Sequence, residues 1–110
     1  MAGSDLYTGT LDVIVLKALS GGSMHGYAIG SWIRKTSEEA MGVREGVLCP
    51  ALHRLERKGL VEALWGKTET GRRAKFYTLT EAGIEHLEVE SKRLTEHSEA
   101  VLSLLRTPGR

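Results

Sequence analysis

Four polar side chains are predicted to lie on one side of a helix spanning Val47–Lys58, and they are of types that bind phosphates and base edges. They are Cys49, His53, Arg54 and Arg57. An arginine guanidinium can pair with guanine or clamp a phosphate, and a histidine imidazole can donate a hydrogen bond to either. Such a set could also be an ordinary solvated helix face. Contact with DNA is the chemistry that the residue types favour.

The opposite side of the same helix is apolar. Its members, spaced i, i+3, i+4 and i+7, are Leu48, Ala51, Leu52 and Leu55. This spacing predicts that the face packs into a core. Pro50 suits a first helical turn, because a missing N–H costs little there, and Gly59 suits the left-handed residue after a helix end. Gly46 and Pro50, at the start of the helix, are included in the predicted DNA-contacting surface.

A basic hairpin is predicted directly after this helix. Strand-like residues at 60–65 and 75–79 flank a polar turn at 66–74. The cations of the hairpin are Lys67, Arg72, Arg73 and Lys75. We expect them to neutralise phosphates or to enter the minor groove, although a basic turn can also serve only solubility. A helix with a cationic outer face followed by such a hairpin is typical of a winged helix-turn-helix.

Charge is distributed unevenly along the chain, although its formal net charge is only +1. Residues 44–75 hold eight Lys or Arg against four Glu, whereas residues 76–105 hold two against six. The basic excess therefore coincides with the helix and hairpin, and the segment after them is acidic. This asymmetry favours a surface that faces DNA at one end of the molecule, over an evenly solvated one.

Two further helices are expected before the basic one. Residues 10–19 form an apolar run that is interpreted as a buried helix, capped by Thr8 or Thr10, rather than as a strand. Residues 25–35 are predicted to form the second helix. At its start, Tyr27 could donate a hydrogen bond to a phosphate or could equally be a core aromatic residue.

A long final helix is predicted from Glu81, with Thr80 as its cap. Its apolar or small residues recur at alternating spacings of three and four: Ile84, Leu87, Ser91, Leu94, Ser98, Val101 and Leu105. This seam is longer than a small winged domain can cover, so the helix needs a partner. A second copy of the chain is the simplest partner, with Leu87, Leu94, Val101 and Leu105 as the predicted dimerisation residues.

Size and composition limit the remaining possibilities. A chain of 110 residues with 41% hydrophobic and 26% charged residues fits one globular domain. No apolar run is long enough to cross a bilayer, no secretory signal is present, and the single cysteine suits a reducing compartment. We therefore expect a soluble cytoplasmic protein without a membrane partner.

Catalysis is not indicated. Metal-binding motifs of the His-Glu-x-x-His or Cys-x-x-Cys type and Gly-rich phosphate loops are missing from the sequence. His86, Glu90 and His97 could approach one helix face, but solvated polar residues explain them better. We expect no enzyme activity, no cofactor and no metal. Cys49 beside basic residues near a helix start raises a separate hypothesis, that of a thiol redox sensor.

Several segments in register resemble the PadR family of bacterial transcriptional regulators. They are residues 9–12, 24–27, 46–56, 72–77 and 79–83. The family usually has tyrosine where this chain has Cys49. The resemblance implies a homodimeric repressor that binds an inverted-repeat operator and releases it when an effector changes the separation of the recognition helices. It also implies a possible small-molecule effector site at the dimer interface, and the short C-terminal region is similar to the family's shorter subgroup.

The fold predicted from these observations is mainly α with a small β-hairpin, an α+β winged helix-turn-helix with a long C-terminal dimerisation helix. Residues 6–80 would form the DNA-binding domain and residues 81–106 the dimerisation helix. The predicted function is sequence-specific binding of double-stranded operator DNA by a ligand-responsive repressor. Two alternatives remain, a winged-helix protein-interaction module and the redox sensor acting through Cys49.

Overall fold

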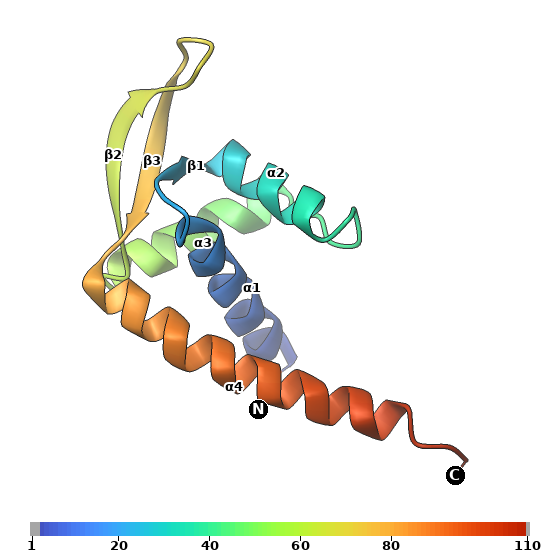
Figure 1. Ribbon diagram of the computed structural model, residues 1–110. Helices are drawn as coiled ribbons and strands as arrows, with labels where there is room; N and C mark the ends of the chain where they lie inside the picture. Colours follow the sequence, from blue (N-terminus) through green and yellow to red (C-terminus); the bar gives the residue numbers. More distant parts are fainter. Residues whose placement is uncertain (1–2, 110) are drawn as a thin grey trace.

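The computed structural model describes residues 3–109 and confirms the predicted class, a mainly helical protein with a small antiparallel sheet (Figure 1). The elements in chain order are α1 (Gly3–Leu19), β1 (Met24–His25), α2 (Gly26–Thr36), α3 (Glu45–Arg57), β2 (Val61–Lys67), β3 (Arg73–Leu79) and α4 (Glu81–Leu105). The strands β2 and β3 form the wing.

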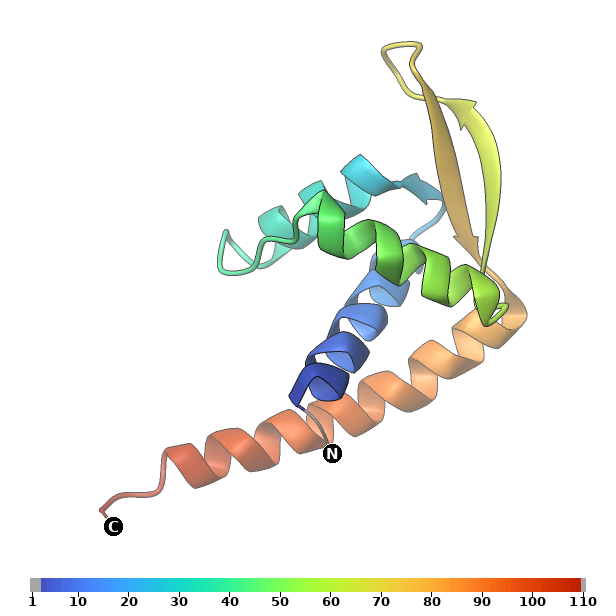
Figure 2. The same cartoon turned by 180° about the vertical axis from the view of Figure 1, so that it is seen from behind.

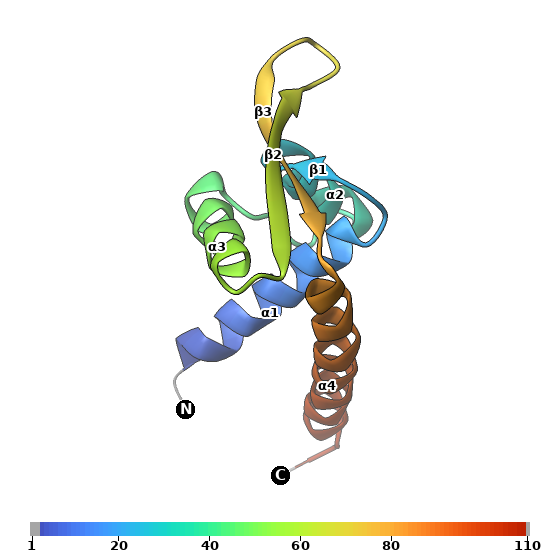
Figure 3. The same cartoon turned by 90° about the vertical axis from the view of Figure 1, so that its left-hand side faces the viewer.

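The core lies between helices α1, α2 and α3 and the base of the sheet. The largest fully buried side chains are Leu16, Ile29, Leu52, Leu55, Val15 and Val61. Helix α1 contacts both α3 and α4, and it runs between them (Figure 3). Helix α3 and the long helix α4 are therefore held on opposite sides of α1.

Helix α1 begins earlier than the sequence predicts. It starts at Gly3, so Thr8 and Thr10 lie inside it and neither caps its start. The predicted start was wrong because the helix continues through Thr8, Gly9 and Thr10 without interruption. Gly9 has open space around it, and an exposed helical glycine costs only about 1 kcal/mol relative to alanine.

The sheet has three strands, not the predicted two, in the order β1–β3–β2. His25 was expected to open the second helix, and in the structure it also belongs to β1, where it pairs with Phe76 of β3. It also caps α2, because its Nδ1 accepts a hydrogen bond from the N–H of Ala28 at 3.2 Å. One histidine therefore ends a strand and begins a helix.

The wing strands are longer than predicted. Gly66 and Ala74 were expected in the turn, but they lie in β2 and β3 and pair with each other. A Cβ added to Gly66 would lie 3.1 Å from Cδ1 of Phe76, so the aromatic ring covers the glycine backbone. Glycine in a strand often marks such a close approach. The actual turn is short, with Gly71 in the left-handed conformation and the N–H of Thr68 donating to the carbonyl of Arg72.

Helix α3 starts at Glu45, so Pro50 lies in its second turn and not, as expected, in its first. Without an N–H, Pro50 cannot donate to the carbonyl of Gly46. The end of the helix agrees with the prediction. Gly59 has a φ of 74°, and the N–H groups of Gly59 and Leu60 donate to the carbonyls of Glu56 and Leu55, which closes the last turn.

Helix α4 begins after the predicted cap. The hydroxyl of Thr80 accepts from the N–H of Gly83 at 3.0 Å and donates to the carbonyl of Gly59 at 2.7 Å. This second bond ties the start of α4 to the end of α3. From this junction α4 extends well past the winged domain, which gives the molecule a longest dimension of 57 Å (Figure 2).

Candidate nucleic-acid interface

The outer face of α3 is exposed along its length, as its residue pattern predicts. The predicted contact residues on it are Gly46, Cys49, Pro50, His53 and Arg57, and all are exposed. The opposite face is buried, with Leu48, Ala51, Leu52 and Leu55 in the core. Val47 is also exposed between Gly46 and Cys49, although its apolar type gave no reason to include it. This face is free to enter a groove.

Arg54 departs from the expected arrangement. Its guanidinium is bound to Asp12 of α1, with 2.8 Å between Nη2 and Oδ1 and a second, longer contact from Nε. The two side chains are only 28% and 11% exposed. Arg54 therefore links α3 to α1 and is not presented outward with His53 and Arg57. Asp12, a lone acidic residue in an apolar run, was the signal that sequence reasoning missed.

Asp12→Ala is expected to lower the free energy of unfolding by about 2 kcal/mol, because a half-buried guanidinium loses its charged hydrogen-bond partner. Urea denaturation measures the change. The matched control is Glu90→Ala, which breaks the more exposed Arg93–Glu90 pair on α4. That loss should stay below about 0.5 kcal/mol. Equal effects of the two substitutions would contradict a structural role for the Asp12–Arg54 pair.

Lys75 lies at the junction of the wing and α3. Its Nζ is 3.6 Å from Oε1 of Glu56 and 5.9 Å from the centre of the Tyr77 ring. Burial raises the pKa of Tyr77 above its ordinary value, and Glu56 and Cys49 act in the same direction. Tyr77 therefore remains a neutral phenol beneath the ion pair. The charge of Lys75 is partly neutralised by Glu56. Its predicted contact with phosphate is therefore less favoured than the contacts predicted for the exposed cations of the wing tip.

The wing tip carries the other predicted cations. Lys67, Arg72 and Arg73 are exposed. The guanidinium carbon of Arg73 lies 4.4 Å from the centre of the Trp65 ring, so this arginine is stacked on an indole. Together with the outer face of α3, these residues form a surface that we call the α3–wing surface: residues 46, 47, 49, 50, 53, 57, 67, 72 and 73.

Tyr27 is 77% exposed, so it is not the core aromatic residue that the sequence allowed. Its ring lies at 20° to the His25 ring with 6.4 Å between their centres. Because His25 caps α2, the two rings mark the start of that helix. The exposed phenol of Tyr27 at the N-terminus of α2 is accessible to a phosphate, as the sequence prediction requires.

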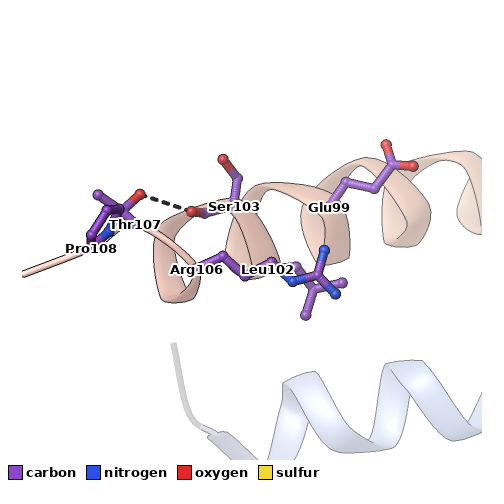
Figure 4. Close-up of a pocket in the computed structure, with 6 residues that line it drawn as sticks. All are labelled: Glu99, Leu102, Ser103, Arg106, Thr107 and Pro108. Atoms are coloured by element: carbon purple, nitrogen blue, oxygen red, sulfur yellow. Dashed lines mark hydrogen bonds between the residues drawn. The ribbon is translucent and has the colours of Figure 1, made fainter.

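The predicted dimerisation residues fall into two groups along α4. Leu87 packs against the core of its own chain and Leu94 is half-buried, whereas Val101 and Leu105 are exposed. An open recess lies beside the last turns of the helix, lined by Glu99, Leu102, Ser103, Arg106, Thr107 and Pro108 (Figure 4). Ile84 and Val89 are exposed in the first half of α4, but the exposed apolar side chains cluster in its distal part, at Val101, Leu102, Leu104 and Leu105.

Two kinds of site are not seen in the described part of the chain. Among the side chains that the structure describes, those of residues 9–109, no three His, Cys, Asp or Glu are grouped so that they could hold a metal ion. No helix in the described part of the chain is long and apolar enough to cross a membrane.

A helix with an exposed polar face, packed on two other helices and followed by a basic β-hairpin, defines a winged helix-turn-helix protein. Residues 15–89 match the model of the PadR-like family of transcriptional regulators. The chain belongs to this family, which confirms the resemblance seen in its sequence.

Related proteins are similar over most of the chain. An uncharacterized protein from Lysinibacillus sphaericus is 30% identical over 92% of this chain and 93% of its own. A transcriptional regulator from Clostridium thermocellum has 29% identity and a TM-score of 0.79, with 97% of this chain and 100% of that one covered. PadR from Bacillus subtilis, solved in complex with operator DNA, has 26% identity and a TM-score of 0.63 over 71% of this chain and 44% of that one.

Proposed function

We propose that the protein is a homodimeric repressor that binds an inverted-repeat operator in double-stranded DNA through its α3–wing surface. The observation that carries this proposal is the exposed, cationic α3–wing surface itself, which lies on the other side of α1 from α4 (Figure 3). Helix α3 would enter the major groove, with His53 and Arg57 at base edges or phosphates, and the wing would lie against the flanking backbone. In a bacterium, such a regulator would meet its operator in the cytoplasm.

The second copy would bind at the distal part of α4. Val101, Leu102, Leu104 and Leu105 are all exposed there, beyond the part of the helix that packs on α1. A cluster of this size leaves apolar surface in water unless another chain covers it. The open recess of Figure 4 borders the same cluster, so a small effector bound in the dimer would contact both chains there.

Replacing both Arg72 and Arg73 with alanine is the direct test of DNA binding by the wing. The variant should bind a duplex selected in vitro and a scrambled duplex more weakly by a similar factor. The slope of log affinity against log salt concentration should flatten by roughly one unit per lost phosphate contact. Fluorescence anisotropy with labelled duplexes over a salt series measures both quantities.

The matched control removes two exposed cations from α4, Lys92 and Arg93, and so changes the net charge equally. Its salt slope should stay at the wild-type value. If both double variants flattened the slope alike, the effect would come from net charge and not from the wing. If the wild-type chain bound no duplex in a salt-dependent way, the proposed function would be wrong, and the protein-interaction alternative would take its place.

A further inference from the structure

The wing carries a large apolar side chain that the fold does not cover. Trp65 is 61% exposed, and the ring contact described for it is with Arg73. Its neighbour Leu64 is 76% exposed on the other face of the same strand. Tryptophan usually buries most of its surface, so an exposed indole beside a cation indicates a surface that meets a partner.

The register of the hairpin shows which way the indole faces. Trp65 pairs with Lys75, and Lys67 pairs with Arg73, so all four side chains lie on one face of the sheet. Farther down the same face, Tyr77 is buried and Lys75 reaches Glu56 of α3. The indole and its arginine therefore stand on the side of the wing that continues from α3, which is the side proposed to face DNA.

Stacking leaves the hydrogen-bonding groups of Arg73 available. The guanidinium carbon lies over the indole ring, and a cation–π contact of this kind does not use the N–H donors of the guanidinium as hydrogen bonds. The ring also restricts a long side chain that would otherwise sample many rotamers. Part of the entropy that Arg73 would lose on binding is then already lost in the free protein.

We propose that Trp65 is a positioning residue for DNA binding. It holds Arg73 so that the guanidinium edge meets a backbone phosphate, while the exposed indole packs against the adjacent deoxyribose. This inference rests on the proposed function and names the wing's partner surface as the sugar–phosphate backbone of duplex DNA. Lys67, on the same face, supplies further positive charge beside the contact.

Trp65→Ala is expected to weaken binding to the selected and the scrambled duplex alike, by about fivefold at low salt. Trp65→Phe should recover most of this loss, because a benzene ring still stacks with a guanidinium. The matched control is Leu64→Ala, which removes an even more exposed apolar side chain from the opposite face and should leave affinity unchanged. All three proteins should keep the wild-type melting temperature, since neither side chain is buried.

A double-variant cycle separates positioning from a simple contact. In the Trp65→Ala protein, the further change Arg73→Ala should cost clearly less affinity than it does in the wild type, because Arg73 is no longer held in place. Strictly multiplicative losses would show that the two side chains act independently and would overturn the positioning role.

Fluorescence gives a readout that a purely structural role would not change. The chain has two tryptophans, Trp32 and Trp65, so Trp32→Phe leaves the wing indole as the sole emitter. Saturation with duplex should quench or shift its emission. If Trp32→Phe failed to fold, the difference between wild-type and Trp65→Phe emission would give the same signal. DNA binding at wild-type affinity with unchanged Trp65 emission would refute the inference while leaving the proposed function intact.

Discussion

Gly83→Ala is expected to lower the free energy of unfolding by about 3 kcal/mol or more. Gly83 is buried in the first turn of α4, where its backbone passes directly over the carbonyl of Leu60. An added Cβ would overlap that carbonyl oxygen and would lie 3.0 Å from its carbon and 3.3 Å from Cδ2 of Leu79. A backbone carbonyl cannot rotate away as a side chain can, so α4 would have to shift from the end of α3.

Urea denaturation followed by circular dichroism measures this change. The control is Gly9→Ala in α1, where nothing lies within 4 Å of the added Cβ. That substitution should be neutral or stabilise the protein by up to about 1 kcal/mol, because alanine is the better helix former. A small effect at Gly83, similar in size to that at Gly9, would contradict the close packing of α4 on Leu60.

Replacing Val101 and Leu105 with glutamate is expected to produce monomers and to weaken operator binding by about two orders of magnitude, because two linked half-site contacts become one. Both residues lie on the exposed distal part of α4. Sedimentation velocity measures the mass, and anisotropy measures the affinity. Deleting residues 94–110 should have the same two effects.

The control for this experiment is Val89→Glu. Val89 is 55% exposed on α4 but lies off the seam that contains Leu87, Leu94, Val101 and Leu105. This variant should sediment like the wild type and bind DNA normally. A wild-type chain that sedimented as a monomer would remove the dimer from the proposal, and a dimer that persisted without residues 94–110 would place its interface elsewhere.

Local sequence patterns predicted the helices and the cap that position the candidate interface. The buried face of α3, the left-handed Gly59 and the cap at Thr80 each depend on neighbours within one or two helical turns, so the sequence alone could show them. The α4 boundary followed from the same kind of signal, a capping threonine followed by an acidic first turn.

Contacts between distant residues escaped prediction. Arg54 has the same charge and helical position whether it faces DNA or Asp12, and only the packing of α1 on α3 decides between them. Gly66 looks like a turn residue until Phe76 is seen to cover it from the next strand. Trp65 was passed over for a similar reason, because its value as a contact depends on which side chain lies across the hairpin.

The hydrogen bond from Thr80 to the carbonyl of Gly59 fixes the first turn of α4 to the end of α3. A change in the angle between the two helices at this junction therefore becomes a large displacement at the far end of α4. A helix of 25 residues is about 37 Å long at 1.5 Å per residue, so a tilt of about 5° at its first turn moves its far end by about 3 Å. Conversely, a displacement of the far end of α4 changes the angle between α4 and α3. A ligand that shifts the far ends of two paired α4 helices by a few ångströms would turn each α3 by only a few degrees, and major-groove contacts would magnify that small rotation into a change of affinity.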